Sequence, residues 1–152
     1  ADLVAALVAA PLRVRGERLV ILLTDGEETC GGDPAAAIEK LRKSGTVVRV
    51  NIVGFAIDDP KLAATFRHWS DSGGGLYFDA RDASSLDQAL TRALQPAVEL
   101  VDGKGQVVAQ GLAGADAPLS AMPGSYTVRL KGRSGAAKSV QVQAKATTSV
   151  AL

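Results

Sequence analysis

The sequence predicts an α/β protein: a partial Rossmann-like parallel sheet with flanking helices at residues 1–95, followed by a small all-β sandwich at residues 96–152. Three observations favour this fold class. The apolar run Leu19–Leu23 ends abruptly in a Thr-Asp-Gly turn, as a buried strand does where it opens into a loop. Acid–proline pairs followed by apolar stripes then alternate with further apolar runs, which is typical of strand–helix–strand units. After Gln95-Pro96, the helical period gives way to short alternating segments.

Composition and charge are those of an ordinary globular protein. Of the 152 residues, 47% are hydrophobic and 22% are charged, and the formal net charge is +1. This balance argues against a dedicated nucleic-acid surface. No stretch reaches the roughly 18 apolar residues of a membrane span. We therefore expect no nucleic-acid partner and no transmembrane segment in this chain.

The first elements of the chain are a helix and a strand. Asp2–Ala10 carries apolar residues on one helical face, and Pro11 and Gly16 mark the loop that follows it. The strand Leu19–Leu23 comes next. It is apolar at every position, so we expect helices to cover both of its faces, as in a parallel sheet.

Acid–proline pairs start the next two helices. Asp33-Pro34 combines an N-cap acid with proline at the first helical position, and this helix runs to about Ser44, where Gly45 closes it. Val47–Ile57 is β-branched and apolar and forms the second strand. Asp58-Asp59-Pro60 then repeats the helix-start signal.

The triple glycine Gly73–Gly75 ends that second helix. Leu76–Phe78 is a short strand near the sheet edge. A final helix follows with apolar residues at helical spacing, and Ser85 and Gln88 fit a capping box at its start.

The second part reads as a small β-sandwich. Asp102–Gly105 and Pro123-Gly124 are hairpin or reverse turns between segments with alternating polarity. The segment Met122–Leu130 resembles the Pro-Gly-x-Tyr-x-Val strand of carboxypeptidase regulatory or transthyretin-like modules. The five expected strands are Val98–Val101, Gln106–Gln110, Ser125–Lys131, Ser139–Gln143 and Thr147–Leu152.

Strand-end carboxylates are the candidate site residues of the first part. Ligands of parallel sheets bind at the carboxyl ends of the strands, which is where Asp25 lies. The alternative is that Asp25 only shapes an Asp-Gly turn. Likewise, Glu27, Glu28 and Asp33 are either further ligands or solvated loop acids.

Other polar residues have simpler explanations. Asp58 and Asp59 form a carboxylate pair after the second strand, but N-capping explains Asp59 without a metal. His68 lies away from the apolar stripe of its helix, so we expect a surface residue and not a catalytic base. Cys30 is the only cysteine, and no base partner lies near it in sequence.

Three segments together resemble a known family: LVILLTDGEETCGGDP, VVRVNIVGFAIDD and GGGLYFDARDASSLDQAL. They are similar to the second half of a bacterial von Willebrand factor type A (VWA) domain, over Ala1 to about Gln95. The family builds its metal-ion-dependent adhesion site from an Asp-x-Ser-x-Ser loop, a threonine loop and a strand-end aspartate. Only the strand-end aspartate is matched here, by Asp25.

The resemblance implies a protein-binding module for adhesion or assembly. Asp25 would help to hold Mg²⁺, Mn²⁺ or Ca²⁺ in the intact protein and so capture an acidic residue of a partner. Thr24, Gly26, Glu27 and Glu28 would form the partner-binding loop. Because the chain has no Asp-x-Ser-x-Ser segment, we expect it to hold no metal by itself.

Two other functions stay open. The chain could be an interaction scaffold that uses no metal. A Mg²⁺-dependent phosphoryl-transfer enzyme is the other alternative, but no phosphate clamp or nucleophile motif supports it, so we predict that the protein is not an enzyme. The Gln- and Thr-rich strands of the second part suggest a periplasmic or extracellular location, although Leu3–Leu12 lacks a signal-peptide pattern. Without the neighbouring Asp-x-Ser-x-Ser strand, we expect residues 19–23 to form an edge that self-associates.

Overall fold

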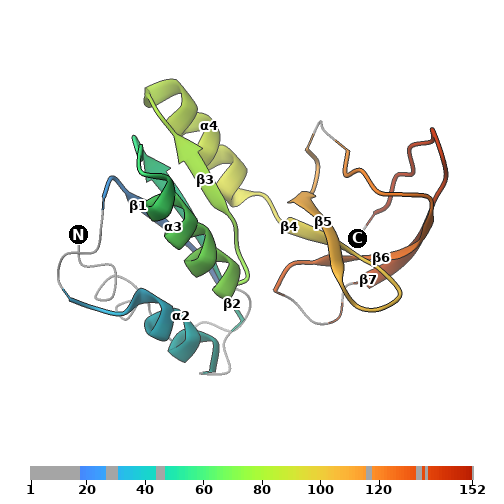
Figure 1. Cartoon of the computed structure of the whole chain (residues 1–152), viewed down its shortest axis with the longest axis horizontal. Helices are drawn as coiled ribbons and strands as arrows, with labels where there is room; N and C mark the ends of the chain where they lie inside the picture. The colour runs from blue at the N-terminus through green and yellow to red at the C-terminus, as the bar shows by residue number, and fades with distance from the viewer. Residues whose placement is uncertain are drawn as a thin grey trace. The chain divides into compact units, whose positions relative to one another are not determined.

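The computed structural model describes residues 18–26, 31–43, 47–115, 118–132, 135 and 137–151. The chain divides into two compact units, Ala1–Leu94 and Gln95–Leu152, which we describe separately (Figure 1). The predictions for the helix at Asp2–Ala10, for Cys30 and for Gly45 concern positions outside the described residues.

The first unit contains a parallel sheet of three strands in the order β1-β2-β3. The register between β1 and β2 is continuous from Arg18 opposite Val48 to Thr24 opposite Gly54. The strand β2 ends at Phe55 because the next residue, Ala56, has a φ of 53°. The predicted mixed α/β class with a parallel sheet is confirmed. The strands are β1 (Arg18–Thr24), β2 (Val48–Phe55) and β3 (Tyr77–Ala80).

Acid N-caps start the helices α2 (Pro34–Lys43) and α3 (Pro60–Ser72), as predicted. The amide of Ala36 donates to Oδ1 of Asp33 over 3.0 Å, and the amide of Lys61 donates to Oδ1 of Asp59 over 2.8 Å. Each bond satisfies an amide that has no partner inside its helix.

The helix α4 (Ala83–Leu94) begins one turn earlier than the predicted capping box requires. The amide of Ser85 donates to Oδ1 of Asp82 over 2.8 Å, and the amide of Asp82 donates to Oγ of Ser85 over 2.9 Å. The box is therefore Asp82 with Ser85, and the predicted pair of Ser85 with Gln88 is wrong. Aspartate accepts from an N-terminal amide as well as serine does, so the earlier acid takes the cap position.

Alternate residues of β2 face the two covered sides of the sheet. Val50 and Ile52 pack with Ile38 of α2 and Phe66 of α3 in the main core. The opposite face carries Asn51 and Val53, and α4 packs on this side against β2 and β3. The residues Val50, Ile52, Val53 and Phe66 are fully buried, as expected for a parallel sheet between helices.

The triple glycine lets the chain pass close to β2 on its way to β3. A Cβ at Gly75 would lie 2.0 Å from the carbonyl oxygen of Val50, and one at Gly73 would lie 2.6 Å from Cβ of Val50. The same approach allows the amide of Val50 to donate to the Gly73 carbonyl over 3.1 Å. Glycine is thus required here by close packing of the backbone.

The second unit is an antiparallel sheet of four strands in the order β5-β4-β6-β7. Its first hairpin turn is held by Asp102, whose Oδ1 accepts from the amides of Lys104 and Gln106 over 2.8 and 2.9 Å. The strands are β4 (Ala97–Val101), β5 (Val107–Leu112), β6 (Gly124–Leu130) and β7 (Ala137–Val142).

The described part of this unit shows one sheet and not the predicted sandwich. The segment 147–151, predicted as a fifth strand, has no strand structure. Residues Thr147, Thr148 and Val150 instead line an apolar cavity of about 210 Å³ together with Leu100, Val128 and Val140 of the sheet. The end of the chain therefore lies against the apolar face of the sheet, where partial burial of Val150 takes the place of backbone pairing.

Candidate functional site

The turn after β1 places Asp25 at the carboxyl edge of the parallel sheet. Thr24, the last residue of β1, is 5% exposed. Its Oγ1 donates to the carbonyl of Gly26 over 3.0 Å and accepts from the Gly26 amide over 3.4 Å. These two bonds close the turn around Asp25 with a buried hydroxyl, so the strand and the turn hold the position of the Asp25 backbone.

The Asp25 side chain projects from this turn and is exposed. It forms no hydrogen bond or ion pair with the residues that the structure describes. Glu27 and Glu28, the other predicted acids of the loop, lie outside the described residues. Asp25 therefore presents a solvated carboxylate on a fixed turn, which suits contact with a partner or with a cation.

The neighbouring strand adds two more acids at the same edge. Asp58 and Asp59 follow the end of β2 and are exposed. Oδ1 of Asp59 is occupied as the N-cap of α3, which agrees with the explanation that needs no metal. Within the described ranges, no group of three or more His, Cys, Asp or Glu side chains is arranged to hold a metal ion.

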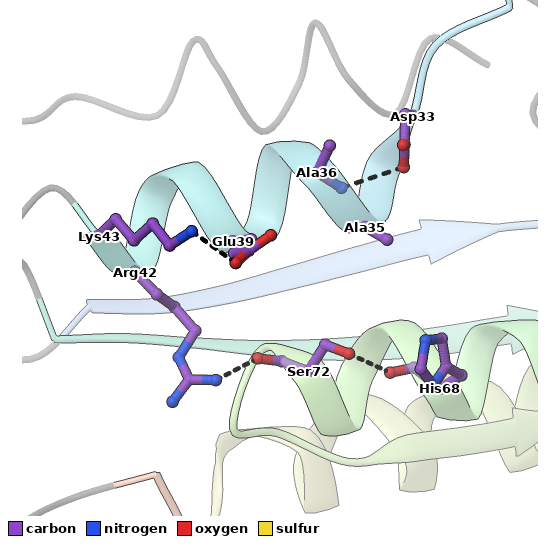
Figure 2. Close-up of a pocket in the computed structure, with 8 residues that line it drawn as sticks. All are labelled: Asp33, Ala35, Ala36, Glu39, Arg42, Lys43, His68 and Ser72. Carbon is purple, nitrogen blue, oxygen red and sulfur yellow. Dashed lines mark hydrogen bonds and ion pairs between the residues drawn. The ribbon is translucent and has the colours of Figure 1, made fainter.

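A second polar feature is an open groove of about 690 Å³ along α2 and α3 (Figure 2). Asp33 lies at one end of it, and Arg42 and Lys43 lie at the other. His68 and Ser72 contribute from α3. Lys43 Nζ is 2.7 Å from Oε1 of Glu39, and Arg42 donates through Nη1 to the Ser72 carbonyl over 2.6 Å.

Three charged side chains of the groove thus have partners in the two helices: Glu39 and Lys43 pair within α2, and Arg42 bonds to α3. The hydrogen bond and positive charge of Lys43 lower the pKa of Glu39 from its usual value. His68 is exposed at this groove and does not belong to the carboxyl edge where Asp25 lies. Asp33, a candidate ligand by sequence, uses Oδ1 to cap α2.

Sequence reasoning missed Asn51, which lies in the middle of β2 and is 1% exposed. Its Nδ2 donates to the carbonyl of Ala93 over 2.6 Å, and its Oδ1 accepts from the amide of Leu76 over 2.9 Å. One side chain therefore ties β2 to the end of α4 and to the start of β3. The only sequence signal was an amide residue inside an apolar, β-branched run.

A polar cluster on β3 was also missed. The Tyr77 hydroxyl donates to Oδ1 of Asp79 over 3.4 Å, and Nε of Arg81 lies 3.3 Å from Oδ2 of the same carboxylate. The Arg67 guanidinium lies 5.0 Å from the centre of the Tyr77 ring. Burial, and then the negative charge of Asp79, raise the pKa of Tyr77 above its usual value.

Comparisons with known proteins identify relatives over about half of the chain. No protein-family model matches it. Uncharacterized protein YwmD of Bacillus subtilis (strain 168) is 46% identical over 84 residues, which is 55% of this chain and 37% of YwmD. Uncharacterized protein YwmC of the same organism is 36% identical over 81 residues, 53% of this chain and 34% of YwmC. The chain thus spans about a third of the length of these relatives.

One solved structure is also similar. The crystal structure of an uncharacterized membrane-spanning protein from Vibrio fischeri matches with 24% identity and a TM-score of 0.42. The match covers 55% of this chain and 46% of that one. A likeness of this size carries no argument about function. The similarity to VWA domains is not tested by these comparisons and stays a prediction.

The expected periplasmic or extracellular location is corrected by this comparison. The similar Vibrio fischeri chain is described as membrane-spanning, which disagrees with that location. Among the helices that the structure describes, none is long and apolar enough to cross a membrane. We therefore assign no location to the protein.

Proposed function

We propose that this chain is part of a protein-binding module of the VWA type, used for adhesion or assembly. The observation that carries the proposal is the exposed Asp25 carboxylate on a turn closed by the buried Thr24 hydroxyl at the end of a parallel strand. A carboxylate held in this way can meet a partner without first losing much conformational freedom. Asp25 and Gly26 form the described, accessible part of the proposed contact surface, and the buried Thr24 supports them from below.

A divalent cation at Asp25 belongs to the proposal only for the intact protein. Mg²⁺ takes about six oxygen ligands, and usually one or two of them are carboxylates. Asp25 alone supplies too few oxygen ligands for Mg²⁺. The described residues by themselves therefore do not form a binding site for the ion. In the longer protein, other segments would supply the remaining ligands, and an acidic residue of the partner would complete them.

Cation titration tests this proposal. Calorimetry with Mg²⁺ and Mn²⁺ on this chain alone should give no micromolar affinity, and Asp25→Ala should change nothing. The intact protein should bind Mn²⁺, and Asp25→Ala should abolish that binding. Asp87→Ala, which removes an exposed acid of α4, is the matched control and should leave it unchanged. An intact protein whose Mn²⁺ affinity survives Asp25→Ala would rule out the metal-dependent form.

A scaffold that uses no metal is the second candidate. The turn itself favours it, because two hydrogen bonds of the Thr24 hydroxyl hold the backbone around Asp25 in place. In this form the partner would contact Asp25 directly, through a basic group. Partner binding by the intact protein would then persist in EDTA and would still be lost in Asp25→Ala. We propose no catalytic role for the chain.

A further inference from the structure

The strand β1 of the first unit has one edge that does not pair with β2. Among the described strands, only β2 pairs with β1. The register between them runs through all seven residues of β1, and no bulge interrupts it. The interior of β1 contains no proline and no charged residue, which are the usual protections of an edge strand.

One face of β1 is also incompletely covered. Leu19, Ile21 and Leu23 lie opposite Arg49, Asn51 and Val53 of β2 and so share the face on which α4 packs. The helix α4 packs on β2 and β3. As a result Leu23 is 49% exposed, whereas its neighbour Val53 is 0% exposed.

We propose that β1 pairs with β1 of a second copy of this chain, antiparallel and across a two-fold axis perpendicular to the sheet. The two three-stranded sheets would then form one sheet of six strands. Such an interface uses the same surface on both copies, which makes it self-complementary and closed. This inference goes beyond the proposed function, because the partner is a second copy of this chain and the strand β1, with the Asp25 turn only at its end, forms the contact.

The sequence of β1 fits one register of this pairing. A two-fold axis through the sheet requires residues of the same face to oppose each other. Placing the axis at Ile21 sets Ile21 against itself, Leu19 against Leu23 and Val20 against Leu22 of the second copy. Every interior residue then meets an apolar residue, and such pairs are the stabilising unit of a sheet.

The charges at the two ends of β1 agree with this register. Arg18 begins the strand, and Asp25 follows its last residue. In the antiparallel pair, Arg18 of one copy comes next to the turn that carries Asp25 of the other. Two pairs of unlike charges therefore flank the apolar contacts, and they should make association weaker at high salt.

Sedimentation of the full chain at low micromolar concentration tests the association. We expect a dimer whose dissociation constant rises at least about tenfold in Leu23→Lys, because each interface would receive two lysines. Leu94→Lys is the matched control, since Leu94 is 64% exposed on α4 in the same unit. It should leave the dimer unchanged, and circular dichroism should show that both variants are folded. A monomeric chain, or equal weakening by both substitutions, would overturn the proposal.

Cysteine cross-linking tests the register. Residues that face each other across an antiparallel pair have Cβ atoms about 4.5–5.5 Å apart, close to the spacing that a disulfide needs. Ile21→Cys, in a chain that also carries Cys30→Ser, should therefore oxidise to a covalent dimer. Val20→Cys in the same background should not, because Val20 faces Leu22 of the second copy. Efficient cross-linking through residue 20 and not through residue 21 would reject this register.

Discussion

At the scale of single residues, Asn51 connects three elements of the first unit. It is the only amide side chain in β2, and both of its polar ends are used, by the Ala93 carbonyl and by the Leu76 amide. The Ala93 carbonyl lies in the last turn of α4, where it has no partner within the helix. A buried side chain thus satisfies backbone groups that water cannot reach.

Replacing Asn51 should therefore lower the free energy of unfolding by more than the loss of its packing contacts alone would. Asn51→Ala leaves the Leu76 amide and the Ala93 carbonyl without this partner, and we expect the free energy of unfolding to fall by about 2–4 kcal/mol. Gln88→Ala on the exposed side of α4 is the control and should change it by less than about 0.5 kcal/mol. Urea denaturation followed by circular dichroism measures both. Equal effects of the two substitutions would contradict this role of Asn51.

Gly75 gives a second prediction at the residue scale. A methyl group at this position would lie 2.0 Å from the Val50 carbonyl oxygen, so Gly75→Ala must displace the backbone between α3 and β3. We expect a loss of about 1–3 kcal/mol of stability, or more. Gly103→Ala adds the same methyl group where no atom lies within 4 Å. Its thermal midpoint should match that of the unchanged chain, and a shift as large as that of Gly75→Ala would refute the packing argument.

At the scale of elements, helix starts are set by acids that accept backbone hydrogen bonds. Asp33, Asp59 and Asp82 each precede a helix and each accept from an amide of its first turn. Two of these acids were candidate ligands by sequence, and the caps account for them. Asp25 and Asp58 are strand-end acids that cap no described helix, and of these two Asp25 is the one that directly follows its strand.

The cap of α4 should make this helix sensitive to acid. The backbone hydrogen bond from Ser85, followed by the bond from its side chain, lowers the pKa of Asp82 below the usual 3.8. A lowered pKa means that the contribution to stability is complete above the unfolded value and is lost as the pH falls through the folded value. The protection of the amides at the start of α4, measured relative to their exchange rate in an unstructured chain at the same pH, should therefore fall below pH 3.8.

Two variants test whether Asp82 is the cause. Asp82→Ala should lower this protection at the start of α4 already at neutral pH, and the protection should then no longer fall with acid. Asp87→Ala, an exposed acid further along α4, should keep the dependence seen in the unchanged chain. If the protection at the start of α4 still falls with acid in Asp82→Ala, the titration of Asp82 is not the cause.

At the scale of the whole molecule, the chain consists of two units with different sheets. The first buries a parallel sheet between helices, and its core includes Phe66 and Ile38. The second is an antiparallel sheet in which Glu99 and Arg129 pair across β4 and β6, with Arg129 Nη2 2.8 Å from Oε2 of Glu99. Each unit has its own buried residues and its own hydrogen-bonded strands.

The first unit should therefore fold without the second. A chain that ends at Gln95 should give a circular dichroism spectrum with helix and strand and should unfold cooperatively in urea, because residues 1–94 form one compact unit. Its transition should coincide with one transition of the full chain. An unfolded shortened chain would show that residues 96–152 are needed for the first core.

The sequence by itself predicted the parallel α/β unit, the order of its elements and two of its three described helix caps. These features depend on local patterns, namely apolar runs, helical spacing and acid–proline pairs, and neighbouring residues determine them. It also placed Asp25 after the first strand, because a strand ends where its apolar run ends.

Only the tertiary structure decided the remaining features. The close passage of Gly75 over β2, the two bonds of Asn51 and the exposed face at Leu23 depend on residues that are distant in sequence. The same holds for the end of the chain, where alternating polarity predicted a strand from Thr147. Alternation shows that one side of a segment is apolar, but burial against the sheet satisfies that side without strand pairing. Which of the two occurs is determined by the space that the other strands leave, and a local pattern does not contain that information.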